Sequence, residues 1–207
     1  MNAFETNSIR YERWFENHPF AYQSELAAVR ELLPKTGRGL EIGTGTGRFS
    51  VPFGIVDGVE PAAAMRRVAQ ERGLNVLDAK AEELPFPNCT FDFALMVTTI
   101  CFVDNPSLAL REAHRVLKPG GQLIVGLVDS DSKLGQKYES RKADSPFYQN
   151  ARFFSASEII QRLDDAGFGN FQCRQTLFQP LEKLIEPELP QKGFGEGGFV
   201  AITGVRP

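Results

Sequence analysis

The stretch GLEIGTGTGR, residues 39–48, places four glycines within ten positions at the end of a short apolar run. A glycine cluster behind a strand indicates that a ligand approaches the backbone too closely to leave room for Cβ atoms. That ligand could be a phosphate, a dinucleotide or another nucleoside-containing cofactor. The stretch by itself does not choose among them.

The spacing of the glycines narrows the choice. Gly43, Gly45 and Gly47 form G-x-G-x-G, with Arg48 where a dinucleotide site would have its third glycine, and no P-loop pattern is present. The next β-rich run ends at Glu60, seventeen positions after Gly43. A carboxylate at the tip of a second strand can accept hydrogen bonds from both hydroxyls of a ribose. This pairing favours a nucleoside cofactor over a purely structural turn.

Length and composition describe an ordinary globular chain. Its 207 residues suit one domain, with 42% hydrophobic and 24% charged residues. The net charge of −3 disfavours a nucleic-acid partner. No apolar run approaches the ~20 residues of a membrane span, and charges throughout residues 1–20 argue against a signal peptide. The three cysteines lack CxxC spacing, so we expect a cytoplasmic protein with no metal site and no membrane insertion.

After residue 36 the chain alternates β-rich runs with helical patterns, which predicts a mainly parallel sheet covered by helices. Strands are expected near 38–42, 55–60, 74–78, 91–97, 122–128, 170–178 and 198–205. Helices are expected near 46–53, 61–72, 106–117 and 155–166. Because no convincing helix separates the last two strands, we expect them to form an antiparallel pair.

Three regions stand outside this alternation. Residues 1–35 carry two helical patterns broken at NHP (17–19), residues 129–154 are polar with the aromatic end PFYQNARFF, and residues 179–197 are a connection containing Pro and Gly. Each N-terminal pattern has one apolar or aromatic face. These faces contain Tyr11, Trp14, Phe15 and His18 in the first pattern, and Tyr22, Leu26, Val29 and Leu33 in the second.

The segment ALREAHRVLKPGGQLIV, which begins at Ala109, resembles the fourth helix and fifth strand of class I S-adenosylmethionine-dependent methyltransferases. The resemblance extends to LEIGTGTGR, GVEPAAAM, AEELPFPNCTFDFALM and AGF (166–168), and it covers residues 37–207. It implies an α/β, three-layer, Rossmann-like methyltransferase fold. Its mostly parallel sheet would have seven strands in the order 3-2-1-4-5-7-6, with strand 7 antiparallel.

By this resemblance the chain, 1–207, is a single methyltransferase domain with four parts. They are an N-terminal helical lid (1–35), a cofactor-binding half (37–128), a cap insertion (129–154), and a C-terminal helix with antiparallel strands (155–207).

The resemblance implies S-adenosyl-L-methionine as cofactor. The residues that it places around this cofactor are Glu41, Gly43, Thr44, Gly45, Glu60, Pro61, Ala81, Glu82, Val97 and Thr98. The chain departs from the family at Lys80, where an aspartate commonly binds the adenine amino group. Either Glu82 replaces that aspartate or the bond is missing. The helix near 46–53 should be short, about two turns, and Ala62 replaces a common serine cap.

Methyl transfer from a sulfonium mainly requires a nucleophile held in line with the methyl group, so no acid–base constellation is required. The segment MVTTICF (96–102) lacks the (Asn/Asp)-Pro-Pro-(Tyr/Phe) pattern of enzymes that methylate nucleobase amines or glutamine amides. We therefore expect a small-molecule acceptor beneath an aromatic lid. Ordinary packing of the aromatic side chains is the alternative. The candidate substrate contacts are Tyr11, Trp14, Tyr22, Thr98 and Thr99.

Two histidines and one cysteine could take a chemical or a structural role. His18 could accept a proton or simply cap a helix, whereas His114 and Cys101 are expected to be structural. Two other functions remain open: a non-catalytic protein that binds S-adenosylmethionine, and a nicotinamide-dependent oxidoreductase. Arg48 and the antiparallel tail disfavour the second.

Overall fold

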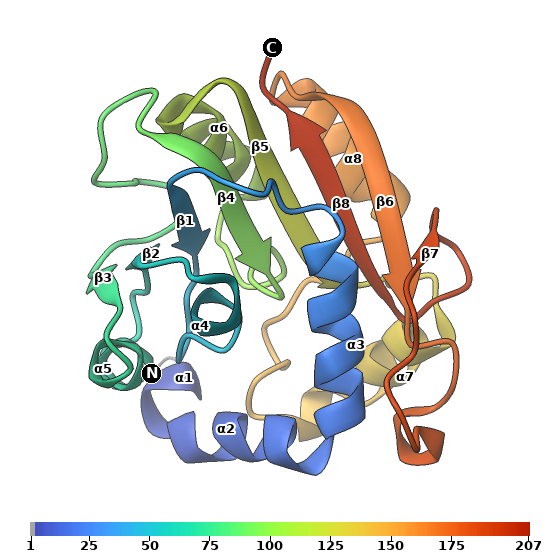
Figure 1. The fold of residues 1–207 in the computed structure, drawn as a ribbon. Coiled ribbons are helices and arrows are strands. Elements are labelled where there is room, and N and C mark those ends of the chain that lie inside the picture. Colours follow the sequence, from blue (N-terminus) through green and yellow to red (C-terminus); the bar gives the residue numbers. More distant parts are fainter. Residues whose placement is uncertain (1–2) are drawn as a thin grey trace.

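The computed structural model describes residues 3–207 and contains one mixed sheet between two layers of helices (Figure 1). The order of its eight strands is β3-β2-β1-β4-β5-β8-β6-β7. The strands are β1 (Gly39–Ile42), β2 (Asp57–Val59), β3 (Asn75–Leu77), β4 (Phe91–Val97), β5 (Leu117–Val128), β6 (Gly169–Thr176), β7 (Gln191–Lys192) and β8 (Phe199–Val205).

The strand order expected from the sequence is confirmed. Strands β1 to β5 are parallel, and β8 inserts antiparallel between β5 and β6 as the predicted seventh strand. The expected count of seven omitted β7, which pairs antiparallel with the free edge of β6. This strand has only two residues, so it carries no alternating pattern that a sequence could reveal.

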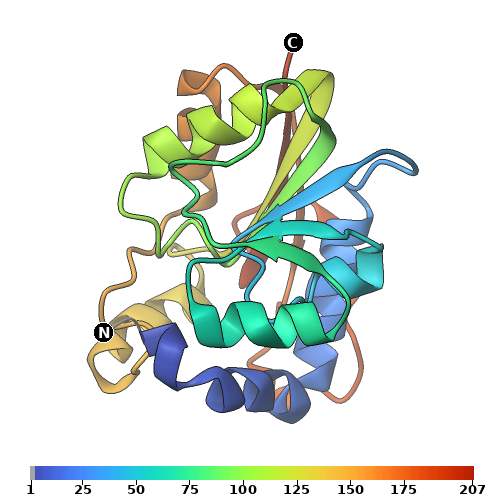
Figure 2. The same ribbon diagram turned by 90° about the vertical axis from the view of Figure 1, so that its left-hand side faces the viewer.

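The helices described are α1 (Ala3–Thr6), α2 (Ser8–Asn17), α3 (Pro19–Arg30), α4 (Ser50–Phe53), α5 (Ala63–Glu71), α6 (Pro106–Val116), α7 (Lys133–Ser140) and α8 (Ala156–Asp165). Short 3₁₀ turns cover Lys142–Asp144 and Leu181–Lys183. Helices α3 and α4 lie on one face of the sheet, and α6 and α8 on the other (Figures 1 and 2).

The central strand β4 explains why both faces are covered. Its sequence FDFALMV is buried almost throughout, as expected for a parallel strand between two helical layers. Leu95 packs into the cluster that contains Ala28 and Val29 of α3, whereas Met96 packs into the cluster with Leu110 of α6. Alternate side chains therefore enter opposite cores.

Local sequence signals set several helix ends. The capping box predicted at SASE is present: the Ser155 hydroxyl accepts from the Glu158 N–H (3.2 Å), and the Glu158 carboxylate accepts from the Ser155 N–H (2.8 Å). Gly73, expected to stop α5, has φ +86°. Ala62 precedes α5 without a side-chain cap, as its apolar side chain requires.

Two helices differ from expectation. The helix expected at 46–53 begins only at Ser50, because Gly45 and Gly47 have positive φ (+56° and +87°) and hold the preceding residues in a turn. The polar insertion contains α7, which the sequence analysis missed because Gly135 interrupts the pattern. That glycine lies against a carbonyl: an added Cβ would stand 2.1 Å from the Asp129 oxygen.

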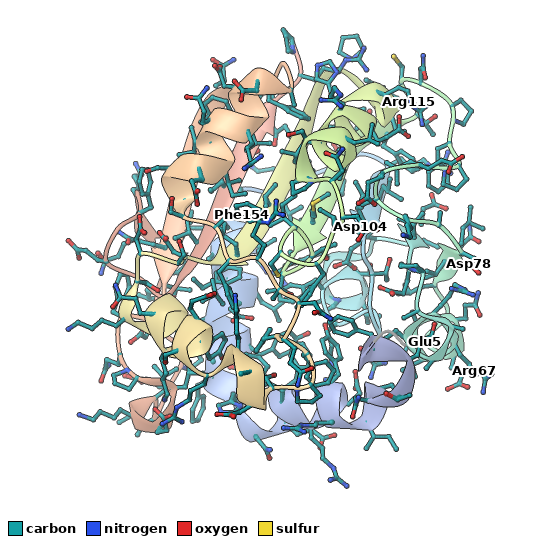
Figure 3. All side chains as sticks on the ribbon, turned by 180° about the vertical axis from the view of Figure 1, so that it is seen from behind. Glu5, Arg67, Asp78, Asp104, Arg115 and Phe154 are labelled. Carbon is teal, nitrogen blue, oxygen red and sulfur yellow. The ribbon has the colours of Figure 1, made fainter. Side chains whose placement is uncertain are left out.

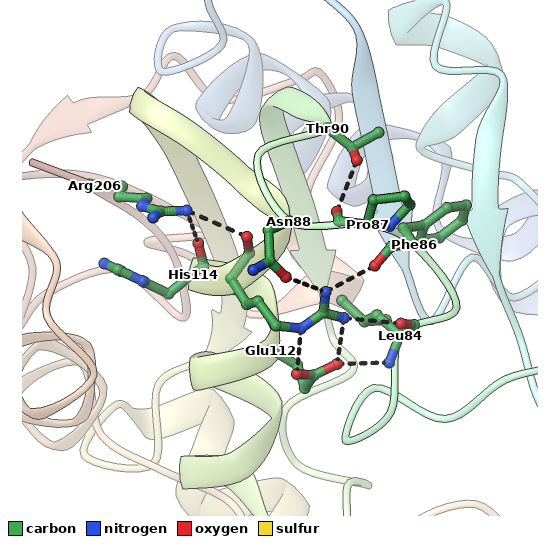
Figure 4. Close-up of polar contacts among 9 residues, drawn as sticks. Leu84, Phe86, Pro87, Asn88, Thr90, Glu112, His114 and Arg206 are labelled. Atoms are coloured by element: carbon green, nitrogen blue, oxygen red, sulfur yellow. Dashed lines mark hydrogen bonds and ion pairs between the residues drawn. The ribbon is translucent and has the colours of Figure 1, made fainter.

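The segment between β3 and β4 is fastened to α6 by Arg115 (Figure 4). Its guanidinium forms an ion pair with Glu112 (2.7 Å) and donates to the carbonyls of Phe86 (2.7 Å) and Leu84 (2.9 Å). His114 lies in the same helix with its ring edge-to-face against Phe168. It does not line the cavity described below.

The N-terminal helices break at NHP as predicted. Helix α2 ends at Asn17 and α3 begins at Pro19, whose fixed φ suits the first turn of a helix. Helix α3 stands along the sheet, while α1 and α2 run across the end at which the β1 and β4 arrows point (Figure 1). The N-terminus thus covers the carboxyl ends of the central parallel strands.

Candidate active site

The strand order reverses between β1 and β4, and in open α/β sheets ligands bind at the carboxyl ends of such strands. The glycine loop follows β1 at this point. Gly43 and Gly45 have φ of +74° and +56°, and both line a cavity of about 640 Å³. An added Cβ at Gly43 would stand 2.3 Å from the Thr99 Cγ2 atom. The loop therefore requires glycine both for its backbone conformation and for its packing.

Glu60 follows β2 and also lines the cavity, although it is only 8% exposed. Its carboxylate accepts from the backbone N–H of Gly45 (2.9 Å) and of Ala62 (2.8 Å). Burial raises the pKa of Glu60, and these two backbone donors partly oppose the increase. The two donors fix the carboxylate while each oxygen keeps acceptor capacity for hydroxyl groups.

Glu41 and Thr44, two of the predicted cofactor residues, lie behind the loop and do not line the cavity. The Thr44 hydroxyl donates to the Glu41 carbonyl (3.1 Å), and the Glu41 carboxylate accepts from the Ser50 hydroxyl. Burial raises the pKa of Glu41 to about 8. In this structure both side chains fasten the glycine loop to β1 and α4.

The tip of β4 turns sharply into the cavity. Thr98 has φ +49°, a strained conformation for a β-branched residue, and its N–H donates to the Gly126 carbonyl (2.7 Å). The turn sends the Thr99 hydroxyl back to the carbonyls of Val97 (3.0 Å) and Gly43 (3.3 Å). The three predicted residues Val97, Thr98 and Thr99 are therefore brought together beside the glycine loop, and all line the cavity.

Pro61, Ala81 and Glu82 also line the cavity. The Glu82 carboxylate accepts from the Asn105 N–H (2.9 Å), and Lys80 forms an ion pair with Asp104 (2.8 Å). Lys80 and Glu82, the two side chains near the adenine position expected from the family, therefore both have partners within the protein. The exposed carboxylate of Asp104 also lines this end of the cavity.

The aromatic side chains of α2 divide between cavity and core. Tyr11 and Trp14 line the cavity, and the Tyr11 hydroxyl lies 3.3 Å from where a Cβ on Gly45 would be. Burial, together with the charges of Glu41 and Glu60, raises the pKa of Tyr11. Phe15 is only 7% exposed and belongs to the core cluster on the α3 face, although it also reaches the cavity.

Tyr22 and His18 have defined partners. The Tyr22 hydroxyl donates to the Arg48 carbonyl, and its ring packs edge-to-face on Phe15, so this predicted substrate residue is placed outside the cavity wall. His18 lines the cavity and stacks on Trp14, and its Nδ1 lies 3.0 Å from the Trp14 carbonyl. Because a carbonyl only accepts, Nδ1 carries the proton in this bond, and in the neutral imidazole Nε2 is then the acceptor.

Two acidic side chains attach the N-terminal helices to the cofactor half. The Glu5 carboxylate accepts from the Ala63 N–H (2.9 Å) at the start of α5, beside which it lies in Figure 3. Glu12 accepts from the Thr46 hydroxyl and forms ion pairs with Arg48 and Arg72. Burial raises the pKa of Glu12, but the bonds from the two arginines outweigh it and the net shift is downward.

The insertion 129–154 completes the wall with aromatic side chains. Of the PFYQNARFF end, Phe147, Tyr148, Phe153 and Phe154 line the cavity, and α7 adds Tyr138. Tyr138 stacks on Tyr148 with their ring centroids 5.2 Å apart. Tyr138 was missed because α7 was missed.

Glu25 of α3 also lines this wall, and it is only 4% exposed. Glu25 was not among the residues predicted for the site, although the sequence carries a signal for it. Glu25 lies four residues after Ala21 and three before Ala28, both buried, so it interrupts an apolar face of the helix.

Cys101 lines the cavity as a thiol, because burial raises its pKa to about 12. Within residues 3–207, no three His, Cys, Asp or Glu side chains gather in a group that could hold a metal ion. Among the helices of this same part of the chain, none has the length and hydrophobicity of a membrane span.

These features define a protein that binds a nucleoside-containing cofactor at the carboxyl edge of a mixed sheet. Comparison with known proteins identifies the family of this protein. A methyltransferase-domain family matches residues 40–125. The crystal structure of an S-adenosylmethionine-dependent methyltransferase of Thermotoga maritima, described as a possible histamine N-methyltransferase, superposes with a TM-score of 0.97. It is 55% identical and covers 99% of both chains.

Proteins similar in sequence were also found. An uncharacterized protein of Methanocaldococcus jannaschii is 46% identical over 203 residues, 98% of each chain. A ubiquinone/menaquinone biosynthesis C-methyltransferase of Syntrophotalea carbinolica is 40% identical over 113 residues, 48% of each chain. The chain belongs to the class I S-adenosylmethionine-dependent methyltransferases, and its cofactor is S-adenosylmethionine.

Proposed function

We propose that this enzyme transfers the methyl group of S-adenosylmethionine to a small-molecule acceptor, which binds in the cavity between β4, α2, α3 and α7. The observation that carries the proposal is a continuous cavity of about 640 Å³, which runs from Gly43 and Glu60 to the aromatic wall at Tyr138 and Tyr148. Its wall is formed by side chains of one chain and is largely aromatic at the far end. A cavity of this size and lining suits a small ligand rather than a polymer.

The chain's residues supply binding and orientation. Glu60 is positioned to accept the ribose hydroxyls, and the bare backbone at Gly43 and Gly45 admits the methionine part. Pro61, Ala81 and Glu82 are positioned along the adenine. When bound, the cofactor supplies a methyl group on a positively charged sulfur. Thr98 and Thr99 lie between the two ends of the cavity, where an acceptor would meet that methyl group.

The surrounding side chains restrict water and orientation. Aromatic rings on α2, on α7 and in the 146–154 segment surround the acceptor end, which favours a desolvated site and a fixed approach. His18, with Nε2 as an acceptor, is the candidate to take a proton if the acceptor must lose one. The Thermotoga relative is described as a possible histamine N-methyltransferase, which supports including amines among the acceptors tested.

The test is turnover with S-adenosylmethionine and a library of amines, phenols and carboxylates, measured as release of S-adenosylhomocysteine. We expect at least one acceptor to give turnover. Glu60→Gln should weaken S-adenosylhomocysteine binding by about 2–3 kcal/mol, the range of charge-assisted hydrogen bonds. Tight cofactor binding without turnover on any acceptor would favour the alternative, a non-catalytic binding protein.

A further inference from the structure

The carboxyl group of Glu25 is buried without a partner. Glu25 lies on α3, is 4% exposed, and lines the acceptor end of the cavity. Among residues 3–207 no hydrogen bond or ion pair to this carboxyl is found, and burial alone acts on its ionisation. A buried carboxyl without a partner costs stability, since its charged form loses hydration and gains nothing in return. Such a group in a ligand cavity indicates that the ligand supplies the partner.

The neighbours of Glu25 are aromatic rather than cationic. Tyr11, Tyr138 and Tyr148 line the same cavity as Glu25, from α2, α7 and the 146–154 segment, and the charge of Glu25 contributes to the raised pKa values of all three hydroxyls. Trp14 lines the same space. A carboxyl beside several aromatic faces offers two favourable interactions to a positively charged nitrogen: an ion pair and cation–π contacts.

The basic side chains that line the cavity do not neutralise the Glu25 carboxyl. Arg10 and Arg141 are exposed, and Lys137 forms an ion pair with Glu182. Lys80 is paired with Asp104, and His18 contacts the Trp14 carbonyl through Nδ1. Burial raises the pKa of Glu25 to about 8, which is the behaviour of a carboxyl that no cation within residues 3–207 has neutralised.

We infer that Glu25 binds a basic nitrogen of the methyl acceptor, so that the substrate is a small amine held between this carboxylate and the surrounding aromatic rings. The inference rests on the proposed function, because it concerns the acceptor end of the same cavity. It adds the chemical class of the substrate and the residue that selects it. A neutral acceptor would leave the Glu25 carboxyl without a charged partner.

The experiment uses the full chain saturated with S-adenosylhomocysteine. Calorimetry would compare a panel of primary amines with the alcohols that differ from them only in the charged group, beginning with 2-phenylethylamine and 2-phenylethanol. The proteins are wild type, Glu25→Gln, and Glu16→Gln as the control. Glu16 is exposed on α2 and outside the cavity wall, so its variant removes one negative charge without touching the site.

We expect wild type and Glu16→Gln to bind at least one amine about tenfold or more tightly than its alcohol, and Glu25→Gln to lose that preference. All three proteins should bind S-adenosylhomocysteine equally. The inference is overturned if no amine exceeds its alcohol, or if Glu25→Gln keeps the preference. It is equally overturned if this variant weakens S-adenosylhomocysteine itself, since Glu25 would then serve the cofactor. Failure of wild type to bind S-adenosylhomocysteine would instead refute the proposed function.

Discussion

At the scale of single residues, Gly43 and Gly54 separate two effects that glycine can have. Both have positive φ, +74° and +68°. An added Cβ at Gly43 would meet Thr99 at 2.3 Å, whereas nothing lies within 4 Å of one at Gly54. Only the backbone strain is therefore common to the two positions.

Gly54→Ala should cost about 1–2 kcal/mol of stability through its backbone conformation alone and leave cofactor affinity intact. Gly43→Ala should cost more and should also weaken S-adenosylhomocysteine binding, because the glycine loop must move away from Thr99. Urea unfolding and calorimetry measure the two quantities. Equal stability losses with unchanged affinity would show that the contact at Gly43 relaxes freely.

Glu25 also makes stability depend on pH. Burial raises its pKa from 4.5 to about 8, so the folded state binds the proton more tightly than the unfolded state. The resulting stabilisation is fully present below about pH 4.5 and is lost as the pH rises through about 8, up to on the order of 5 kcal/mol. The neighbouring hydroxyls of Tyr11, Tyr138 and Tyr148 have raised pKa values and do not titrate in this window.

Glu25→Gln should therefore gain stability relative to wild type as the pH is raised from about 5 to about 9. Urea unfolding of both proteins at several pH values measures this difference. A difference that stays constant over the range would mean that the Glu25 carboxyl keeps an ordinary pKa.

At the scale of elements, α2 is attached to the cofactor half mainly through Glu12. This one side chain contacts Thr46 and Arg48 in the glycine loop and Arg72 after α5. On the other side of α2, Tyr11 and Trp14 face the cavity. Removing Glu12 should therefore loosen the helix without altering its cavity side chains.

Glu12→Ala should increase amide hydrogen exchange across residues 8–17 and speed the release of S-adenosylhomocysteine several-fold, because α2 must open for release. Glu16→Ala, on an exposed position of the same helix, is the control. Exchange that rises without faster release would show that α2 does not gate the cofactor.

At the scale of the whole molecule, ligand binding should raise the stability of the folded protein. A ligand that binds only the folded state at a hundred times its dissociation constant adds about 2.7 kcal/mol. For a chain of this size that corresponds to a rise in melting temperature of roughly 5–10 °C. S-adenosylhomocysteine should produce this rise and NAD should not. A comparable rise with NAD would reopen the choice of cofactor that Arg48 and the antiparallel β8 disfavour.

The order of the strands was implied by the resemblance to a family. The sequence by itself determined which segments form the main strands, the glycine loop and the position of Glu60. These features depend on local signals: an apolar run such as β4, a glycine where φ must be positive, a carboxylate at a strand end. The capping box at Ser155 and the break at NHP are equally local, and both were predicted correctly.

Only the tertiary structure decided what surrounds the acceptor. Glu25 became a candidate because α7 lies far from α2 and α3 in the sequence but lines the same cavity, and none of the three helices supplies a partner for the Glu25 carboxyl. Tyr22 was assigned to the substrate because it belongs to the aromatic N-terminal region that was expected to form a lid, yet its hydroxyl binds the Arg48 carbonyl. The left-handed turn at Thr98 depends on a bond to Gly126 on a neighbouring strand. Sequence patterns report periodicity and backbone preference, whereas a binding wall is made by contacts between distant segments.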